Sequence, residues 1–231
     1  MICYNELING FDSSFTLLDK SFFNKKTPPQ LKKHTWVVRS FPARWIKKTI
    51  EIINTLNLKY MVEIGTIREP ITDHCVDYFE NNNIITGNKK PQCCEGGHST
   101  YFWSKYTKLE KIYTVDIDPN TQAIIKKTFP TIPKNLIPII NDGILFCQKL
   151  KTKIDFLYLD GWDINTDNYK DKHLQAYLAI KDKFNPLHIV SIDDTDFAYN
   201  RGKDGTLTSY LLDNNYTQLL SGRQRLFIKQ N

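Results

Sequence analysis

The feature that most constrains the fold is a short apolar run that ends in an acid and a glycine. This run covers residues 59–66 (Lys-Tyr-Met-Val-Glu-Ile-Gly-Thr), and a later run, 111–119, places Asp116 near its end. A strand, a glycine turn and an acid closing the next strand are typical of a nucleotide-binding α/β crevice, in which the carboxylate accepts hydrogen bonds from ribose hydroxyls. The first run is not followed by the G-x-G-x-x-G string of dinucleotide sites, so a dinucleotide is not the first expectation.

Strand-like and helical stretches alternate through most of the chain. Strands are predicted at 60–64, 112–116, 136–140, 154–159 and 187–192, and helices at 42–56, 99–108, 120–129, 143–151, 168–184 and 204–213. Nearly continuous apolar strands separated by helices predict a parallel sheet covered on both faces. Two last apolar runs, joined at Ser221-Gly222, predict a hairpin. We therefore expect an α/β fold: a doubly wound, Rossmann-like, mostly parallel seven-stranded sheet with a C-terminal antiparallel hairpin.

Length and composition fit either one large domain or one domain with an extension. The 231 residues are 41% hydrophobic and 13% aromatic, which is ample for a packed core. We assign residues 1–41 to an N-terminal arm and residues 42–231 to the main domain. Five cysteines, an odd count, favour free thiols in a reducing cytoplasm. We expect neither a signal peptide nor a membrane span, because the sequence shows no apolar stretch of the required kind.

The net charge of +6 is concentrated near the N-terminus. Residues 20–48 hold many lysines and arginines and no acid. One interpretation is a patch for nucleic acid, and the other is a solvated arm followed by one helix face. The run lacks the Gly-aromatic pattern of an RNA platform, so we favour the solvated arm and do not expect a nucleic-acid partner.

A long polar segment, 67–95, interrupts the region after the first strand. Segments of this length inside a domain are usually lids or disordered, and we predict a lid-like insertion. It is followed by Gly96-Gly97, after which Ser99 or Thr100 is expected to cap the next helix. The side chains of His74, Cys75, Cys93, Cys94 and His98 are only a weak zinc signal, because they lack C-x-x-C spacing.

Acidic residues occur at or just after the ends of five successive strands. They are Glu63, Asp116, Asp142, Asp160 and the pair Asp193-Asp194. The carboxyl ends of parallel strands share one edge of the sheet, so these acids should line one crevice. Asp142 is also well placed to begin a helix, because it precedes Gly143.

Three of these acids suggest a metal site. Asp160, Asp193 and Asp194 would supply the hard oxygen ligands that Mg²⁺ prefers, and the ion would lower the pKa of a bound substrate hydroxyl. The alternative is that Asp193 and Asp194 cap a loop without metal. His173, on a predicted helix, is a candidate base by its ordinary pKa, although a lone helical histidine is more often a packing residue.

The series Val-Glu-Ile-Gly-Thr, Gly-Gly-His-Ser-Thr, Val-Asp-Ile-Asp-Pro, Leu-Asp-Gly-Trp-Asp and Ile-Asp-Asp, with the terminal hairpin, resembles the class I S-adenosylmethionine (SAM)-dependent methyltransferases. The most similar group is the metal-dependent O-methyltransferases of macrolide sugars and bacterial surface glycans. The resemblance covers residues 45–231. It implies cofactor contacts from Glu63, Gly65, Thr66, Gly97, Ser99, Asp116, Ile117, Asp142, Gly143 and Asp160.

The resemblance also implies specific roles. Asp116 would hold the ribose, Asp142 would meet the adenine amino group, and Mg²⁺ would bind Asp160, Asp193 and Asp194. Asp163 stands nearest to the position of a proposed base in such relatives.

We therefore expect Mg²⁺-assisted, SAM-dependent methyl transfer to a hydroxyl of a small polyol or sugar, in a glycan or a sugar nucleotide. One alternative is an RNA or DNA methyltransferase using the basic N-terminal region, although Asp160-Gly-Trp-Asp163 is not the Asn/Asp-Pro-Pro-aromatic motif of amino-directed enzymes. A NAD-dependent sugar dehydrogenase and a non-enzymatic binding domain are further alternatives. The sequence leaves open whether the protein forms a homo-oligomer.

Overall fold

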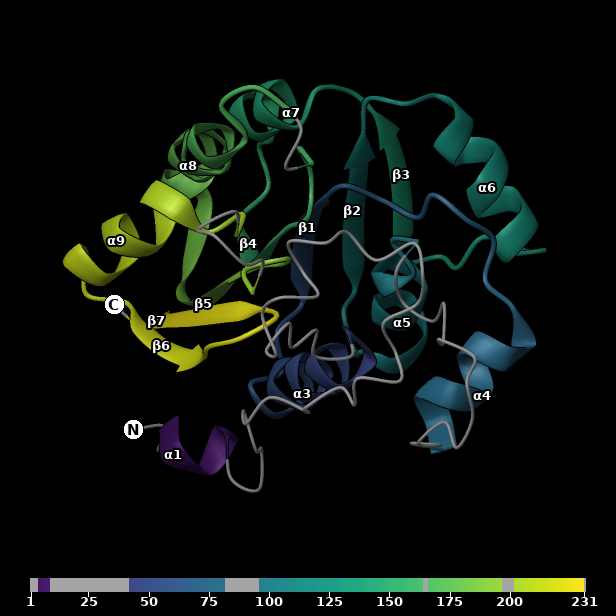
Figure 1. Ribbon diagram of the computed structural model, residues 1–231, viewed down its shortest axis with the longest axis horizontal. Helices are drawn as coiled ribbons and strands as arrows, with labels where there is room; N and C mark the ends of the chain where they lie inside the picture. The colour runs from purple at the N-terminus through teal and green to yellow at the C-terminus, as the bar shows by residue number, and fades with distance from the viewer. Residues whose placement is uncertain (1–3, 9–41, 82–95, 164–165, 197–201, 231) are drawn as a thin grey trace, which may run out of the picture.

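The computed structural model describes residues 4–8, 42–81, 96–163, 166–196 and 202–230 (Figure 1). Most of the basic run, together with Cys93 and Cys94, lies outside these ranges, so the nucleic-acid and zinc hypotheses stay predictions there. A short helix, α1 (Tyr4–Leu7), precedes the main domain. Within the described ranges, no helix has the length and apolarity needed to cross a membrane.

Seven strands form one sheet in the order β3-β2-β1-β4-β5-β7-β6. The strands are β1 (Tyr60–Ile64), β2 (Lys111–Asp116), β3 (Leu136–Ile140), β4 (Ile154–Leu159), β5 (Phe184–Ile192), β6 (Thr217–Leu220) and β7 (Arg225–Gln230). Neighbours among β1 to β5 pair in parallel, and β7 is antiparallel to both β5 and β6. The expected fold class, including the terminal hairpin, is confirmed.

Helices cover both faces of this sheet (Figure 1). They are α3 (Pro42–Thr55), α4 (Asp73–Asn81), α5 (Ser99–Tyr106), α6 (Asn120–Thr128), α7 (Gly143–Lys149), α8 (Tyr169–Ile180) and α9 (Gly205–Asp213). Buried side chains of α3 to α6 belong to one hydrophobic cluster and those of α7 to α9 to another. The sheet lies between the two clusters.

Strand alternation explains the two clusters. All six residues of β4 are buried. Phe156 and Tyr158 join the cluster beneath α3 and α5, whereas Leu157 and Leu159 join the cluster beneath α7 and α8. Successive side chains of a strand point to opposite faces, so a central strand is largely apolar, and in β4 the one charged residue is Asp155. This requirement is why the strand predictions were close to the observed bounds.

The segment 67–95 differs from the expected polar lid over the residues that the structure describes. Residues 73–81 form α4, whose Cys75 and Phe79 are only 1% and 3% exposed. The Phe79 ring stacks on Phe102 of α5 with centroids 3.8 Å apart. Two apolar side chains on one helix face were enough to dock this part of the segment in the core, which the polar composition of the whole segment concealed.

The junction before β5 also differs from expectation. Helix α8 ends at Ile180, a 3₁₀ turn covers Lys181–Lys183, and β5 then begins at Phe184 rather than at 187. The pairing of β4 with β5 is irregular between Ile154 and Phe156. Such an irregularity allows Pro186 to lie within a strand, although proline cannot donate a ladder hydrogen bond.

Candidate active site

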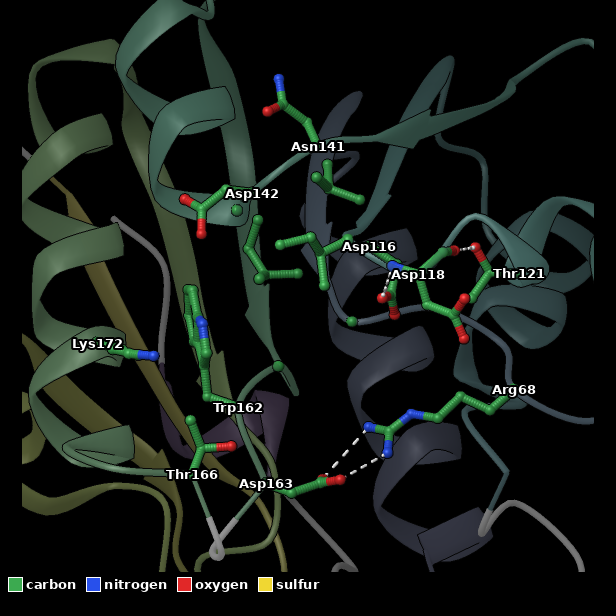
Figure 2. A pocket seen from close by; sticks show the side chains of 16 residues that line it. Arg68, Asp116, Asp118, Thr121, Asn141, Asp142, Trp162, Asp163, Thr166 and Lys172 are labelled. Atoms are coloured by element: carbon green, nitrogen blue, oxygen red, sulfur yellow. Dashed lines mark hydrogen bonds and ion pairs between the residues drawn. The ribbon is translucent and has the colours of Figure 1, made fainter.

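A cleft of about 480 Å³ opens at the carboxyl edge of the sheet, between the loops after β1, β2, β3 and β4 (Figure 2). Parallel-sheet proteins bind ligands at this edge, where the strand order reverses on either side of β1. Six residues predicted from the sequence line the cleft: Gly65, Asp116, Ile117, Asp142, Gly143 and Asp163. Another five cofactor candidates are not among its lining residues: Glu63, Thr66, Gly97, Ser99 and Asp160.

Gly65 makes the first turn of the cleft. Its φ is +90°, and a Cβ there would lie 2.9 Å from the backbone C and O of Asp160. Its amide donates to the carbonyl of Val115 at 2.9 Å. Only glycine combines this positive φ with such a close approach of two loops, so the turn predicted from the sequence has a clear steric cause.

The start of the segment 67–95 lies against Gly96, the residue that follows this segment, beside this turn. The carbonyl of Gly96 accepts hydrogen bonds from the amides of Arg68 at 2.7 Å and Glu69 at 3.3 Å. Gly97 has a φ of +71°, and a Cβ there would clash with the carbonyl of Thr66. Gly97 therefore lies against the residue that follows Gly65, although the segment 67–95 separates them in the sequence, and α5 begins two residues after Gly97.

Glu63 lies beneath the cleft rather than in it. It is fully buried, and its carboxylate accepts hydrogen bonds from the Ser99, Thr100 and Thr114 hydroxyls at 2.8 Å each and from Trp103 Nε1 at 3.1 Å. Burial raises the pKa of Glu63 to about 7 against the opposing effect of these hydroxyls. The expected cofactor contact is thus replaced by a structural role, because α5 covers the face to which Glu63 points.

The same contacts correct the expected helix cap. The N-cap residue of α5 is His98, which makes no side-chain capping bond. Ser99 and Thr100 instead point their hydroxyls into the sheet toward Glu63. His98 is buried, and its Nδ1 lies 3.5 Å from the sulfur of Cys75. This contact joins two of the zinc candidates, while the zinc hypothesis itself stays a prediction.

Asp116 stands at the cleft as expected. Its Oδ2 accepts a hydrogen bond from the amide of Thr66 at 3.2 Å, and its Oδ1 accepts one from the amide of Asp118 at 3.0 Å. Thr66 therefore holds the Asp116 carboxylate through its backbone instead of lining the cleft. The neighbouring Ile117 is 70% exposed. A fixed carboxylate next to an exposed apolar side chain suits the sugar and base of a nucleoside.

Asp142 combines both roles that the sequence suggested. It lines the cleft, and its Oδ1 caps α7 by accepting hydrogen bonds from the amides of Ile144 at 2.9 Å and Leu145 at 3.0 Å. A Cβ on Gly143 would lie 2.6 Å from Cγ2 of Ile64. Glycine at this position lets α7 begin directly against the end of β1, which forms one wall of the cleft.

The three predicted metal ligands do converge. One oxygen each from Asp160, Asp193 and Asp194 lies within 4.8 Å of the others, and no second group of this kind occurs among the described residues. Asp160 follows β4, and the other two follow β5, the next strand in the sheet. Burial raises the pKa of Asp193, against the opposing effect of Arg223.

Two cations that the sequence did not indicate lie within this cluster. Lys203 is 1% exposed, and its Nζ lies 2.8 Å from Asp160 Oδ1 and 3.1 Å from Asp194 Oδ2. Arg223 Nε lies 3.4 Å from Asp193 Oδ1, and its Nη2 also contacts Asp194. Burial would lower the pKa of Lys203, but Asp160 and Asp194 raise it above its ordinary value. Each cation sits in a polar segment without periodicity, so no sequence signal distinguished it.

The two candidate bases have opposite surroundings. Asp163 is on the cleft wall, where Arg68 forms a two-pronged ion pair with it at 2.9 Å and 3.4 Å (Figure 2). His173 is completely buried, and its Nδ1 lies 2.8 Å from the carbonyl of Tyr169. Its ring meets Trp162 edge-on, and burial, followed by the nearby Lys203, lowers its pKa to about 3. His173 is buried and is not among the residues that line the cleft, so the structure does not support the prediction that it is a base.

Neither a protein-family model nor a curated protein matches this sequence. Solved structures with similar folds include the O-methyltransferase TomG from Streptomyces achromogenes, solved with SAM, at a TM-score of 0.55 and 10% identity over 93% of this chain and 91% of that chain. A methyltransferase from Geobacter sulfurreducens has a TM-score of 0.52 at 10% identity, covering 84% of this chain and 81% of that one.

A third similar structure is a protein proposed to be an rRNA-methylase from Clostridium thermocellum, with a TM-score of 0.50 at 9% identity over 80% of this chain and 97% of that chain. Identities this low establish the architecture and leave the substrate open. The chain has the fold of the class I SAM-dependent methyltransferases.

Proposed function

We propose that this protein transfers a methyl group from SAM to a hydroxyl of a small polyol or sugar, free or within a glycan. The observation that carries this proposal is the Asp116 carboxylate, fixed at the cleft beside the Gly65 turn. A carboxylate at the end of β2 is suited to accept hydrogen bonds from the two ribose hydroxyls of a nucleoside. The cleft volume of about 480 Å³ lies in the range of small-molecule sites.

The proposed chemistry needs an acceptor oxygen that can lose its proton. SAM, when bound, supplies an electrophilic methyl group. Asp163 lies at the cleft and is the proposed base, with its carboxylate oriented by Arg68 at 2.9 Å. The side chain of Asp163 is 55% exposed, so an acceptor could reach it. Trp162, beside Asp163, provides an apolar wall that would limit the entry of water.

The alternatives receive less support. The strand order includes an antiparallel β7, whereas dinucleotide-binding enzymes of the dehydrogenase type have the order 3-2-1-4-5-6. For a nucleic-acid acceptor, two lysines of α3 are already engaged within the protein: Lys47 donates to the carbonyl of Glu80 at 3.3 Å, and Lys48 pairs with Glu51 at 2.9 Å. A small acceptor is therefore our proposal, and an RNA acceptor is an outcome of the test below.

The first test is SAM binding by titration calorimetry. Asp116→Ala should weaken binding by more than about tenfold, because a hydrogen bond to a charged group contributes about 1.5–3 kcal/mol. Asp213→Ala is a matched control, since Asp213 is an exposed carboxylate at the end of α9. It should bind SAM like the wild type. A wild-type protein that does not bind SAM, or an Asp116→Ala protein with undiminished affinity, would contradict the proposal.

The second test identifies the acceptor class. S-adenosylhomocysteine release should be measured with panels of polyols, sugars and sugar nucleotides, and in parallel with ribosomal and transfer RNA. Methylated product in the sugar panel supports the proposal. Product from RNA alone would show that the cofactor assignment is right and that the acceptor is a nucleic acid.

A further inference from the structure

The acidic cluster at the ends of β4 and β5 does not fit Mg²⁺ as it stands. Mg²⁺ requires nearly octahedral oxygen ligands at about 2.0–2.1 Å and keeps several waters. Here an ammonium group occupies the space between two of the three carboxylates: Lys203 Nζ lies 2.8 Å from Asp160 Oδ1 and 3.1 Å from Asp194 Oδ2. The third carboxylate, Asp193, faces Arg223. Each of the three expected metal ligands is therefore paired with a cation of the protein.

We propose that Lys203 is the built-in cation of this cluster and takes the place of a divalent metal ion at the acceptor side of the methyl-transfer site. The catalytic role of Lys203 rests on the proposed function. Whether Lys203 or a metal ion is the cation of the cluster can be tested independently of that function. Lys203 would act as a positioning residue, since its Nζ lies 3.7 Å from Asp163, the proposed base.

Three donors of the ammonium match three acceptors. Lys203 Nζ donates to Asp160 Oδ1 at 2.8 Å and to the Asp160 carbonyl at 3.1 Å, and it approaches Asp194 Oδ2 at 3.1 Å. A lysine ammonium has three N–H groups, so this set satisfies it. A buried, satisfied ion pair is costly to open, because each charge would be left without its partner. The ammonium is therefore a fixed part of the site.

The backbone holds Lys203 in this place. Its amide donates to the carbonyl of Asp194 at 3.1 Å, so the two residues are tied by backbone as well as by charge. At the preceding residue, Gly202, a Cβ would lie 2.5 Å from the carbonyl of Thr195. The segment that carries Lys203 thus packs directly against the segment that carries two of the acids.

The charges also argue against an added ion. With all three carboxylates ionised, Asp160, Asp193 and Asp194 contribute three negative charges and Lys203 and Arg223 two positive ones, so the net charge of the cluster is −1. A divalent ion would reverse this balance to +1 and would lie beside a buried ammonium. Repulsion between like charges at such distances is strong where water is excluded. One monovalent cation, together with Arg223, therefore supplies enough positive charge to compensate all but one of the three carboxylates.

The experiment is a Mn²⁺ titration of the full-length, chelator-treated protein, followed by electron paramagnetic resonance. We expect no saturable Mn²⁺ binding by the wild type, and methyl transfer that persists in EDTA. Lys203→Met keeps the apolar stem but removes the ammonium from Asp160 and from Asp194 Oδ2, so Mn²⁺ affinity should rise by at least about tenfold. Lys203→Arg restores a cation and should bind Mn²⁺ no better than the wild type.

Lys126→Met is the matched control, because Lys126 is exposed on α6. Thermal unfolding shows whether each variant folds. If Lys203→Met does not fold, the wild type and Lys203→Arg still decide whether the cluster binds Mn²⁺. Saturable Mn²⁺ binding by the wild type that Asp193→Asn abolishes would overturn the proposal, as would a folded Lys203→Met protein that gains no affinity. SAM affinity is measured separately. A wild-type protein that does not bind SAM would contradict the proposed function and not the proposal about Lys203.

Discussion

Glu63 is a carboxylate that the fold buries completely, and its titration couples stability to pH. Its pKa is raised to about 7 in the folded protein, from an ordinary value of 4.5. The folded state therefore binds an extra proton between these two pH values. The stability contributed by Glu63 is fully present below pH 4.5 and is lost as pH rises through 7, by up to about 1.4 kcal/mol per pH unit.

Glu63→Gln should remove this pH dependence, because glutamine resembles the protonated acid and does not titrate. We expect the free energy of unfolding of the wild type to fall relative to that of Glu63→Gln between pH 5 and pH 7. Urea unfolding at several pH values measures it. Glu51→Gln is the control, since the Glu51 side chain is 63% exposed. Parallel pH curves for wild type and Glu63→Gln would show that Glu63 titrates normally.

Helix α4 packs in the core, although it lies in a segment of polar composition. Its Phe79 stacks on Phe102 and lies 5.2 Å from the Tyr106 ring, both on α5. Lys47 of α3 donates to the carbonyl of Glu80 at 3.3 Å. The helix therefore packs against α3 and the later part of α5, away from the end of α5 that meets the cleft. None of the described residues of α4 is among those that line the cleft, and its buried side chains belong to the core cluster.

Phe79→Ala should destabilise the protein by about 3–5 kcal/mol, because truncating a buried phenylalanine leaves a cavity as well as losing apolar contact. Asp77→Ala is the matched control, since Asp77 is exposed on the same helix. It should change stability by less than about 0.5 kcal/mol. Midpoints of urea unfolding measure both effects. Equal midpoints for the two variants would show that α4 is not part of the core in solution.

The C-terminal hairpin is the last part of the chain to join the sheet, and its turn lies next to the end of β5. Arg223, in the turn between β6 and β7, is 6% exposed and pairs with Asp193 and Asp194. Its carbonyl accepts a hydrogen bond from the amide of Thr195 at 3.0 Å. The hairpin therefore does more than extend the sheet, because it supplies one of the cations of the acidic cluster.

Arg223→Met should cost about 3–5 kcal/mol of stability, because removing one partner leaves buried acids uncompensated. Arg225→Met is the matched control: the Arg225 side chain is 31% exposed and pairs with Asp204 at 2.9 Å. Its loss should cost about 1 kcal/mol or less. Calorimetric unfolding compares the two, and a similar small loss in both would show that the Arg223 pairs are solvated rather than buried.

The sequence by itself determined the architecture and the position of the cleft. Strands such as β4 are largely apolar because both faces are covered, and this pattern is local and readable. Asp116 could be assigned from sequence because a strand end and its acid are neighbours in the chain. The convergence of Asp160, Asp193 and Asp194 followed from the rule that parallel strands end at one edge.

Only the tertiary structure decided which charged groups meet. Whether Glu63 faces the cleft or the core depended on α5 covering it, and α5 lies beyond the segment 67–95 in the chain. Lys203 and Arg223 reach the acids from two different segments, and electrostatic attraction requires proximity in space rather than in sequence. Lone cations in polar segments carry no periodic signal. The partners of the acidic cluster were therefore determined by how β5, the loop before α9 and the hairpin pack together.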